Sequence, residues 1–120
     1  SIALFATSCK NEKDVKDTAS PAVVIHSPAS GQNFVAGDTI VFSATASDND
    51  ELHEVTIHIH NETTDEHIVQ SDIHVDASTY PYSFSYIVTQ SDSTEFHFEV
   101  AATDHSNNSV SAEVMCTANY

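Results

Sequence analysis

Residues 39–47 of the chain read TIVFSATAS, and apolar and polar side chains alternate along this run. Because successive side chains of an extended strand point to opposite faces, the apolar set falls on one face and the hydroxyl-bearing set on the other. Residues 82–89, YSFSYIVT, repeat the pattern, with Tyr82, Phe84 and Tyr86 on the apolar face. Both runs predict half-buried β-strands, and no run in the chain has the apolar spacing of an amphipathic helix.

Similar runs, separated by clusters of Gly, Pro, Asn, Asp and Ser, continue along the rest of the chain. We predict seven strands, the fourth broken near Ser71, at residues 22–26, 39–47, 54–60, 67–75, 82–89, 95–103 and 110–117. Seven short strands in 120 residues are typical of a single two-sheet sandwich. The expected core consists of Ile40, Phe42, Val55, Ile57, Ile59, Phe84, Tyr86, Phe96, Phe98 and Val100.

The distribution of charge excludes two classes of partner. The chain has 18 acidic residues and a net charge of −15, and its three basic residues are Lys10, Lys13 and Lys16. Nucleic-acid binding needs Lys or Arg to displace phosphate counterions, and an anionic membrane surface repels an acidic domain. We therefore expect no nucleic-acid partner, and contact with a membrane through a lipid anchor alone.

Residues 21–50, PAVVIHSPASGQNFVAGDTIVFSATASDND, resemble the opening of bacterial immunoglobulin-like domains of secreted and surface proteins. The likeness continues in residues 81–86, PYSFSY, and in residues 100–104, VAATD, followed by the Asn-Asn-Ser of residues 107–109. The resemblance implies an all-β fold, an immunoglobulin-like two-sheet antiparallel sandwich of about seven strands over residues 21–120. It also implies a spacer, adhesive or binding module.

The N-terminal residues resemble part of a bacterial lipoprotein. Residues 1–8, SIALFATS, form an apolar, signal-peptide-like leader that runs into Cys9, and residues 9–20 are polar, as in a flexible tether. The resemblance implies lipidation of Cys9 and a lipid-anchored place in the bacterial cell envelope, at the outer membrane or cell surface. Cys116 falls on the apolar face of the last predicted strand, where we expect an inert structural thiol, and a Cys9–Cys116 disulfide is the alternative.

Signatures of common enzyme sites are missing from the sequence. There is no Gly-x-Ser-x-Gly motif, the two glycines leave no room for a phosphate-binding loop, and there is no Trp to form a platform for a sugar. We therefore expect a protein that is not an enzyme.

The segment at residues 53–76, HEVTIHIHNETTDEHIVQSDIHVD, departs from the immunoglobulin-like pattern through its histidines. If Ile57 and Ile59 face the core, His58 and His60 share the outer face about 6–7 Å apart. The following turn places His67 opposite or nearly opposite His60 on the next strand. We predict a transition-metal site, for zinc or copper, whose remaining ligands come from His74, His97 and Glu99.

A second candidate cation site is weaker. Asp48, Asp50 and Glu51 cluster after the second predicted strand, and Asp104 precedes a loop that the fold can bring to the same end. Calcium accepts such oxygen ligands, but aspartates also satisfy turn backbone, and both interpretations stay open.

Two hypotheses of function follow. The first is a non-enzymatic envelope module that binds a transition metal on a histidine-rich sheet face. The second is a structural or adhesive surface protein, or a polymer subunit, in which residues 1–5 donate a strand to the sheet edge of a protein partner or of a second copy.

Overall fold

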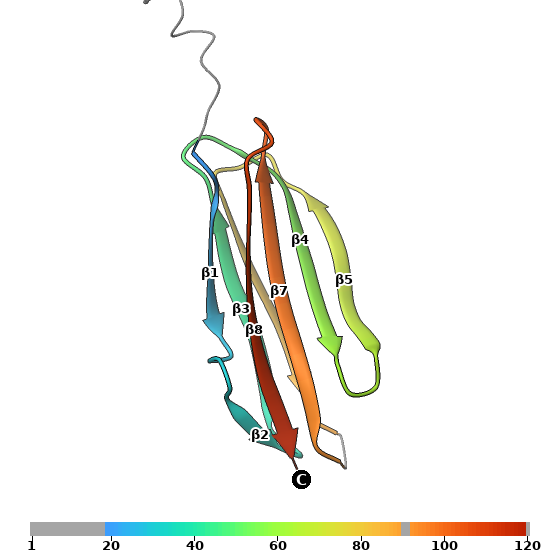
Figure 1. Ribbon diagram of the computed structural model, residues 1–120. Coiled ribbons are helices and arrows are strands. Elements are labelled where there is room, and N and C mark those ends of the chain that lie inside the picture. The colour runs from blue at the N-terminus through green and yellow to red at the C-terminus, as the bar shows by residue number, and fades with distance from the viewer. Residues whose placement is uncertain (1–18, 90–91, 120) are drawn as a thin grey trace, which may run out of the picture.

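The computed structural model describes residues 19–89 and 92–119 (Figure 1). Among these residues there is no helix, and hence none long and apolar enough to cross a membrane. The strands are β1 (Ala22–Ser27), β2 (Asn33–Val35), β3 (Thr39–Ser47), β4 (Leu52–Asn61), β5 (Glu66–His74), β6 (Thr79–Ile87), β7 (Thr94–Asp104) and β8 (Ser109–Asn119). The prediction of an all-β chain is confirmed.

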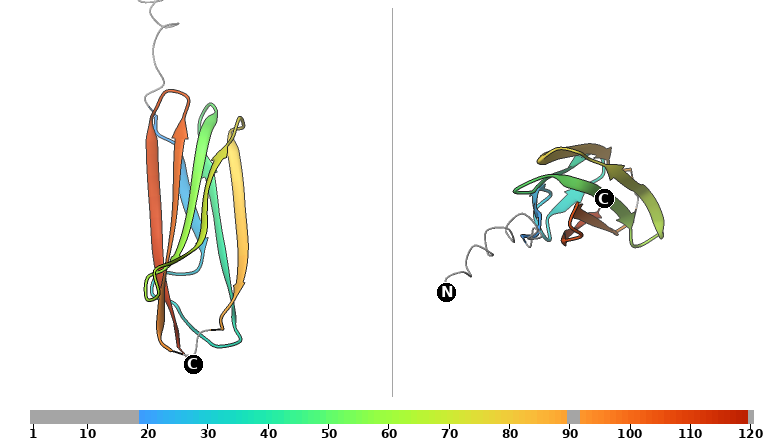
Figure 2. Two further views of the ribbon diagram at one scale, coloured as in Figure 1. Left: turned by 90° about the vertical axis from the view of Figure 1, so that its right-hand side faces the viewer. Right: turned by 90° about the horizontal axis from the view of Figure 1, so that it is seen from above.

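The strands form two sheets that face each other as layers (Figure 2). One sheet has three strands in the order β1-β3-β6, and the other has five in the order β2-β8-β7-β4-β5. The two long strands β4 and β7 pair antiparallel in the larger sheet. The predicted two-sheet sandwich is confirmed.

The described residues form eight strands, so the prediction of seven missed β2. This strand has three residues, too few to show an alternating pattern, and it pairs in parallel with β8. Gly31 and Gly37 on either side of it have φ angles of 77° and 95°, which favour glycine. β2 therefore exists because two glycine turns bring Phe34 over the open end of the core, where its side chain is buried.

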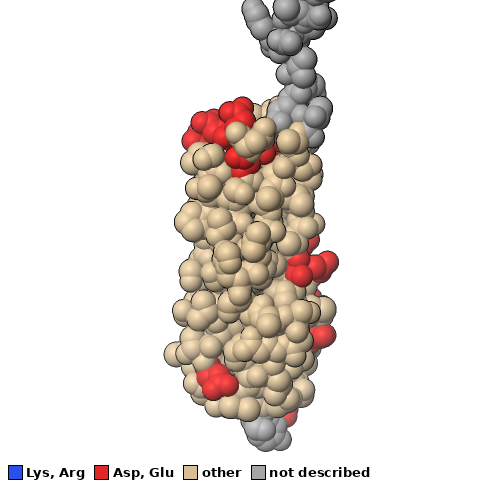
Figure 3. All heavy atoms as spheres, turned by 90° about the vertical axis from the view of Figure 1, so that its left-hand side faces the viewer, with Lys and Arg blue, Asp and Glu red and all other residues tan. Residues whose placement is uncertain are grey.

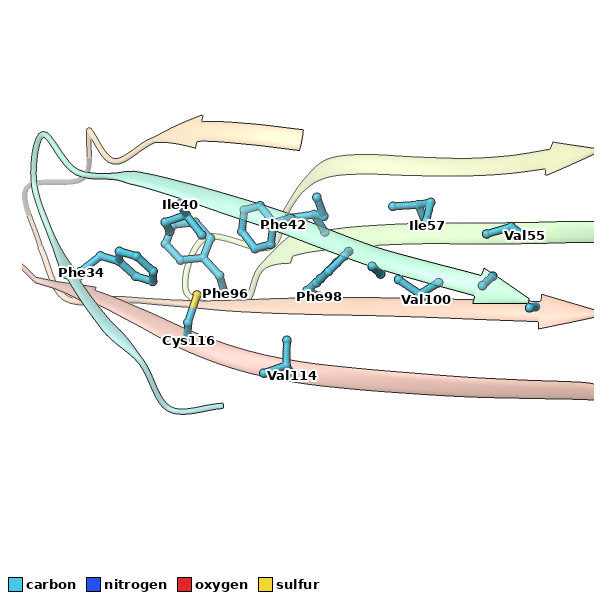
Figure 4. Packing of buried hydrophobic residues seen from close by; sticks show 14 of the residues in the cluster. Phe34, Ile40, Phe42, Val55, Ile57, Phe96, Phe98, Val100, Val114 and Cys116 are labelled. Carbon is cyan, nitrogen blue, oxygen red and sulfur yellow. The ribbon is translucent and has the colours of Figure 1, made fainter. Parts of the chain in front are cut away.

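The core lies between the sheets and contains the predicted aromatic and aliphatic side chains (Figure 4). Phe42 on β3 meets Phe98 on β7 edge to face, with ring centroids 5.3 Å apart, and both are fully buried. Phe84 and Tyr86 pack against this core and are half-buried, because the smaller sheet covers less area. The aliphatic face of β4, with Val55, Ile57 and Ile59, is fully buried. Because side chains alternate along a strand, the residues between them, including His58, lie on the outer face of the sheet.

Two β-bulges interrupt the pairing of β4. Next to β5 the register passes from Ile59 opposite Val69 to His60 opposite His67, so Ile68 is an extra residue. On the side of β7, Leu52 lies opposite Asp104 and Glu54 lies opposite the next residue, Thr103, so His53 is an extra residue. The predicted break of the fourth strand near Ser71 is wrong: β5 is continuous, and its irregularity lies at Ile68.

The thiol of Cys116 belongs to the core, as predicted. Its residue is 1% exposed, it is a free cysteine, and burial raises its pKa to about 11, which makes the reactive thiolate scarce at neutral pH. The predicted leader, Cys9, the tether up to residue 18 and the strand donated by residues 1–5 lie outside the described residues.

Candidate functional site

The histidines are divided unevenly between the two sheets. One histidine, His26, lies on β1 in the smaller sheet and contacts the Thr45 hydroxyl at 2.9 Å. The others lie on β4, β5, β7 or the turn after β7: His53, His58, His60, His67, His74, His97 and His105. The larger sheet therefore concentrates imidazole groups, and β4, which alone contributes three, is the strand that organises them.

The bulge at Ile68 brings His67 to the outer face of the sheet. Val69 pairs with Ile59 on the core side, so strict alternation would turn His67 to the core side as well. The extra residue reverses the alternation and leaves His67 exposed opposite His60. We call the group formed by His58, His60, Asp65 and His67 the hairpin cluster, because it lies on the β4–β5 hairpin.

The three imidazole rings of the hairpin cluster are mutual neighbours. Ring centroids are 5.5 Å apart for His58 and His60, 5.2 Å for His58 and His67, and 4.7 Å for His60 and His67. Nε2 of His58 lies 3.0 Å from Nδ1 of His67, so one nitrogen donates a proton and the other accepts it through a lone pair. At least one of these rings is therefore neutral and carries a lone pair able to bind a metal.

His60 is the most buried ring of the cluster, with 9% of the residue exposed. Its Nδ1 lies 2.8 Å from Oε2 of Glu62, and its Nε2 lies 2.9 Å from Oδ1 of Asp65. The hydrogen bond with Glu62 is the largest of the effects that raise the pKa of His60, and the same bond lowers the pKa of Glu62. Glu62 thus holds one nitrogen of His60, as carboxylates commonly do for metal-bound histidines, while Asp65 occupies the other nitrogen in the metal-free chain.

His58 titrates in the opposite direction. Its pKa is lowered, first by burial and then by the positive charges that His67 and His60 would carry, while Glu99 opposes the shift. A lowered pKa keeps His58 neutral to more acidic pH. The cluster thus contains one imidazole with a raised pKa, His60, and one with a lowered pKa, His58.

The other predicted ligands separate into two groups. Glu99 pairs with His58 and His97 pairs with His60 across β4 and β7, so both lie beside the cluster. His97 also contacts Glu113 through Nε2, and its Nδ1 lies 3.5 Å from Oε2 of Glu62. His74 lies at the far end of β5, opposite Glu54 and away from the cluster.

One member of the hairpin cluster was missed by the sequence analysis. A carboxylate oxygen of Asp65 and one ring nitrogen each from His60 and His67 all lie within 4.8 Å of one another. Asp65 has a φ of 67°, and its amide donates to the carbonyl of Asn61 at 2.7 Å, so it also closes the hairpin turn. Its position in that turn, five residues after His60, is the signal that could have identified it.

The predicted calcium ligands have roles in turns. Asp104 is buried, and its Oδ1 accepts hydrogen bonds from the amides of Ser106 and Asn108, both at 2.9 Å. Oδ2 of Asp48 accepts from the amide of Asp50 at 3.1 Å. Within the described residues, the two three-residue groups with suitably close ligand atoms include none of these three aspartates. The geometry favours turn stabilisation, and calcium binding here stays a prediction.

Similarity to one solved structure agrees with the fold. The fibronectin(III)-like modules of Clostridium thermocellum CbhA match with a TM-score of 0.53 at 20% identity, over 82% of this chain and 96% of that one. The sporulation control protein Spo0M of Bacillus subtilis gives a TM-score of 0.44 at 6% identity, over 84% of this chain and 49% of that one. No curated protein matches the sequence. The sequence model described as "Bacterial Ig domain" matches residues 21–114, most of the chain, so this protein belongs to the bacterial immunoglobulin domain family.

Proposed function

We propose that this bacterial immunoglobulin domain is a non-enzymatic module of the cell envelope that captures Zn²⁺ or Cu²⁺ at the hairpin cluster. The observation that carries the proposal is the close approach of His60, His67 and Asp65, whose ligand atoms lie within 4.8 Å of one another. His58, hydrogen-bonded to His67, is the further imidazole.

The donor set suits a borderline transition metal. Zinc and copper bind imidazole nitrogen and carboxylate oxygen, and zinc prefers four ligands in a tetrahedron. The 2.9 Å between Nε2 of His60 and Oδ1 of Asp65 now accommodates a proton. A metal ion takes the place of that proton after a small outward shift, because two ligands of a tetrahedral zinc ion lie about 3.3 Å apart.

Charge and surroundings support the same proposal. Glu62 holds the second nitrogen of His60, and Glu99 lies opposite His58, so carboxylates flank the imidazoles. The described residues contain no Lys or Arg whose charge would repel a cation. An acidic field raises the local concentration of cations and supports their capture.

The family is consistent with a place outside the cytoplasm and a non-catalytic role. Bacterial immunoglobulin domains are often extracellular or surface-associated, and they serve typically as structural, adhesive or binding modules. To this we add anchoring through a lipid on Cys9, which the lipoprotein-like residues 1–8 support. Mass spectrometry of the protein from its native membranes would detect the lipid, and an intact leader on the mature chain would contradict the anchor.

Isothermal titration calorimetry of the untagged protein with Zn²⁺ and with Cu²⁺ tests the metal site. We expect that replacing His58 and His60 together with Ala lowers the affinity of the hairpin cluster at least 100-fold. The matched control is His26→Ala, which removes an imidazole from the other sheet and should leave binding unchanged. Elemental analysis of protein purified without a tag is the complementary measurement.

Unchanged zinc and copper affinities in the double variant would contradict the proposal. So would an equal loss in the His26→Ala control, because that result would show that any surface imidazole contributes. Circular dichroism of each variant confirms that the all-β fold is retained, since the replaced side chains lie on the outer face of the sheet.

A further inference from the structure

We infer that a second divalent-metal site lies at the other end of the five-stranded sheet, formed by Glu51, Asp76 and His105. One ligand atom from each of these residues lies within 4.8 Å of the other two. We call these residues, together with His53 and His74, the loop cluster. The inference does not depend on the hairpin cluster, because the two groups share no residue.

Three connections bring the loop cluster together. Glu51 precedes β4, Asp76 follows β5, and His105 begins the turn between β7 and β8. These connections lie at one end of the sandwich, where β4 begins (Figure 1). His60 lies seven positions after His53 along β4, which places the two clusters about 23 Å apart at about 3.3 Å per residue.

Hydrogen bonds outside the ligand groups hold these connections in place. The amide of Leu52 donates to the carbonyl of Ala77 at 2.9 Å, which ties the chain after Glu51 to the chain after Asp76. The buried carboxylate of Asp104 accepts from two amides of the β7–β8 turn and so shapes the turn that carries His105. The cluster is therefore organised by the backbone before any ion arrives.

The spacing of the ligand atoms suits a shared ion. Nε2 of His105 lies 3.4 Å from Oδ1 of Asp76 and 3.6 Å from Oε1 of Glu51. Both separations exceed those of ordinary N–H···O hydrogen bonds, which are about 2.7–3.2 Å. They are close to the separation of about 3.3 Å between two ligands of a tetrahedral zinc ion with bonds of about 2.0–2.1 Å.

The remaining histidines of the cluster orient the ligands. Nε2 of His74 lies 2.9 Å from Oδ2 of Asp76, so Asp76 is held through one oxygen while the other faces His105. His53, the extra residue of the second bulge, places its ring 5.2 Å from that of His74 and 4.8 Å from that of His105. Carboxylates and imidazoles that position a metal ligand in this way are a common feature of metal sites.

The electrostatic setting also favours a divalent cation. Glu51 and Asp76 together carry two negative charges at neutral pH, and the described part of the chain has no Lys or Arg to neutralise them. Acidic side chains gather at the end of the molecule where the described chain begins (Figure 3). A divalent ion would neutralise these carboxylates, whereas neutral imidazoles cannot.

Zinc stoichiometry of the full chain tests the inference. We expect two Zn²⁺ ions per chain for the wild type by calorimetry at pH 7.5, and one for the double variant Asp76→Asn with His105→Ala. The variant with His58 and His60 replaced by Ala should also bind one ion, at the loop cluster. The His26→Ala control should bind two.

Nuclear magnetic resonance locates the ion without any substitution. Zinc added to the wild-type chain should shift the resonances of the His105 ring nitrogens. The dependence of this shift on zinc concentration should be independent of that of the His60 resonances. One ion per chain in the wild type, together with unmoved His105 resonances, would overturn the second site. If the hairpin cluster binds no ion, zinc should still shift the His105 resonances. Failure of the proposed function and failure of the second site are therefore distinguishable.

Discussion

The two histidine clusters occupy opposite ends of β4 and are built in different ways. The hairpin cluster comes from one continuous segment, residues 58–67, and its central ring, His60, is nearly buried. The loop cluster draws on three connections between residues 51 and 105, and its groups are exposed. The hairpin cluster offers three imidazoles and one carboxylate as ligands, whereas the ligands of the loop cluster are one imidazole, from His105, and two carboxylates.

What the two clusters share is a β-bulge. Ile68 is the extra residue beside the hairpin cluster, and His53 is the extra residue within the loop cluster. Bulges change the direction of side chains and are common near functional sites. The comparison teaches that the bulge at Ile68 brings a ligand, His67, into the hairpin cluster, whereas the ligands of the loop cluster come from connections between strands and the bulge at His53 adds a neighbouring ring.

The largest expected effect comes from removing the support that both clusters share. Phe98 on β7 is fully buried, lies opposite Ile59 of β4 and packs on Phe42. Replacing Phe98 with Ala should lower the free energy of unfolding by about 3–5 kcal/mol, because a cavity is left in the core. Urea denaturation followed by circular dichroism measures it.

The control for this variant is Thr56→Ala on the outer face of β4. Its hydroxyl donates to Asp72 at 3.0 Å in an exposed position, so its loss should cost about 1 kcal/mol or less. Equal effects of the two substitutions would contradict the assignment of the core face.

Alternation of side chains was sufficient to predict the core and part of one cluster. The buried Val55, Ile57 and Ile59 imply outward His58 and His60, and the antiparallel return of the chain implies His67 nearby. Such inferences need local sequence alone. The same reasoning placed His74 in the site because it considered the face of the strand alone; seven positions at about 3.3 Å each put His74 about 23 Å beyond His67.

The loop cluster was beyond sequence reasoning for a physical reason. His105 and Asp76 lie close together because β5 and β7 both pair with β4 and both finish at the end of the sandwich where β4 begins. This proximity follows from the order of strands in the sheet. The sequence predicts Glu51 near a calcium site with Asp104, but the carboxylate of Asp104 accepts hydrogen bonds within its own turn. Asp65 was missed because turn aspartates are ordinary.

Acidification should separate the two sites. Lowering the pH from 7 to 5.5 protonates histidines with the ordinary pKa of about 6.5, and ligating imidazoles must be neutral. Zinc affinity should fall by about eightfold for each ligating imidazole, hence by roughly 500-fold at the hairpin cluster, which has three, and by about eightfold at the loop cluster, where one imidazole binds directly. Calorimetry of the two double variants at both pH values measures each site alone. Equal losses would contradict the assigned ligand sets.

Substitution of a single carboxylate should lower the zinc affinity of one cluster and leave that of the other unchanged. Asp65→Asn removes the charge next to His60 but retains a residue tolerated at a φ of 67°. We expect the zinc affinity of the hairpin cluster to fall by more than the roughly tenfold typical of losing a group that only supports a metal site, because Asp65 is itself a ligand, while the loop cluster is unchanged. Asp76→Asn is the mirror experiment and should weaken the loop cluster alone. A loss at both sites from either variant would show that the clusters are not independent.

The smallest effect concerns protons in the metal-free chain. The hydrogen bond that His60 donates to Glu62 is the largest cause of the raised pKa of His60, so Glu62→Gln should lower that pKa, as measured by the pH dependence of the His60 ring resonances. A histidine whose pKa is higher in the folded state stabilises the fold below its unfolded pKa, and that contribution disappears as the pH rises through the folded value. The variant should therefore be less stable than the wild type at pH 5.5 and equally stable at pH 8.5. Since His105 at the other end of β4 does not contact Glu62, its titration should be unaffected, and a shift of His105 in this variant would mean that protonation couples the two ends of the sheet.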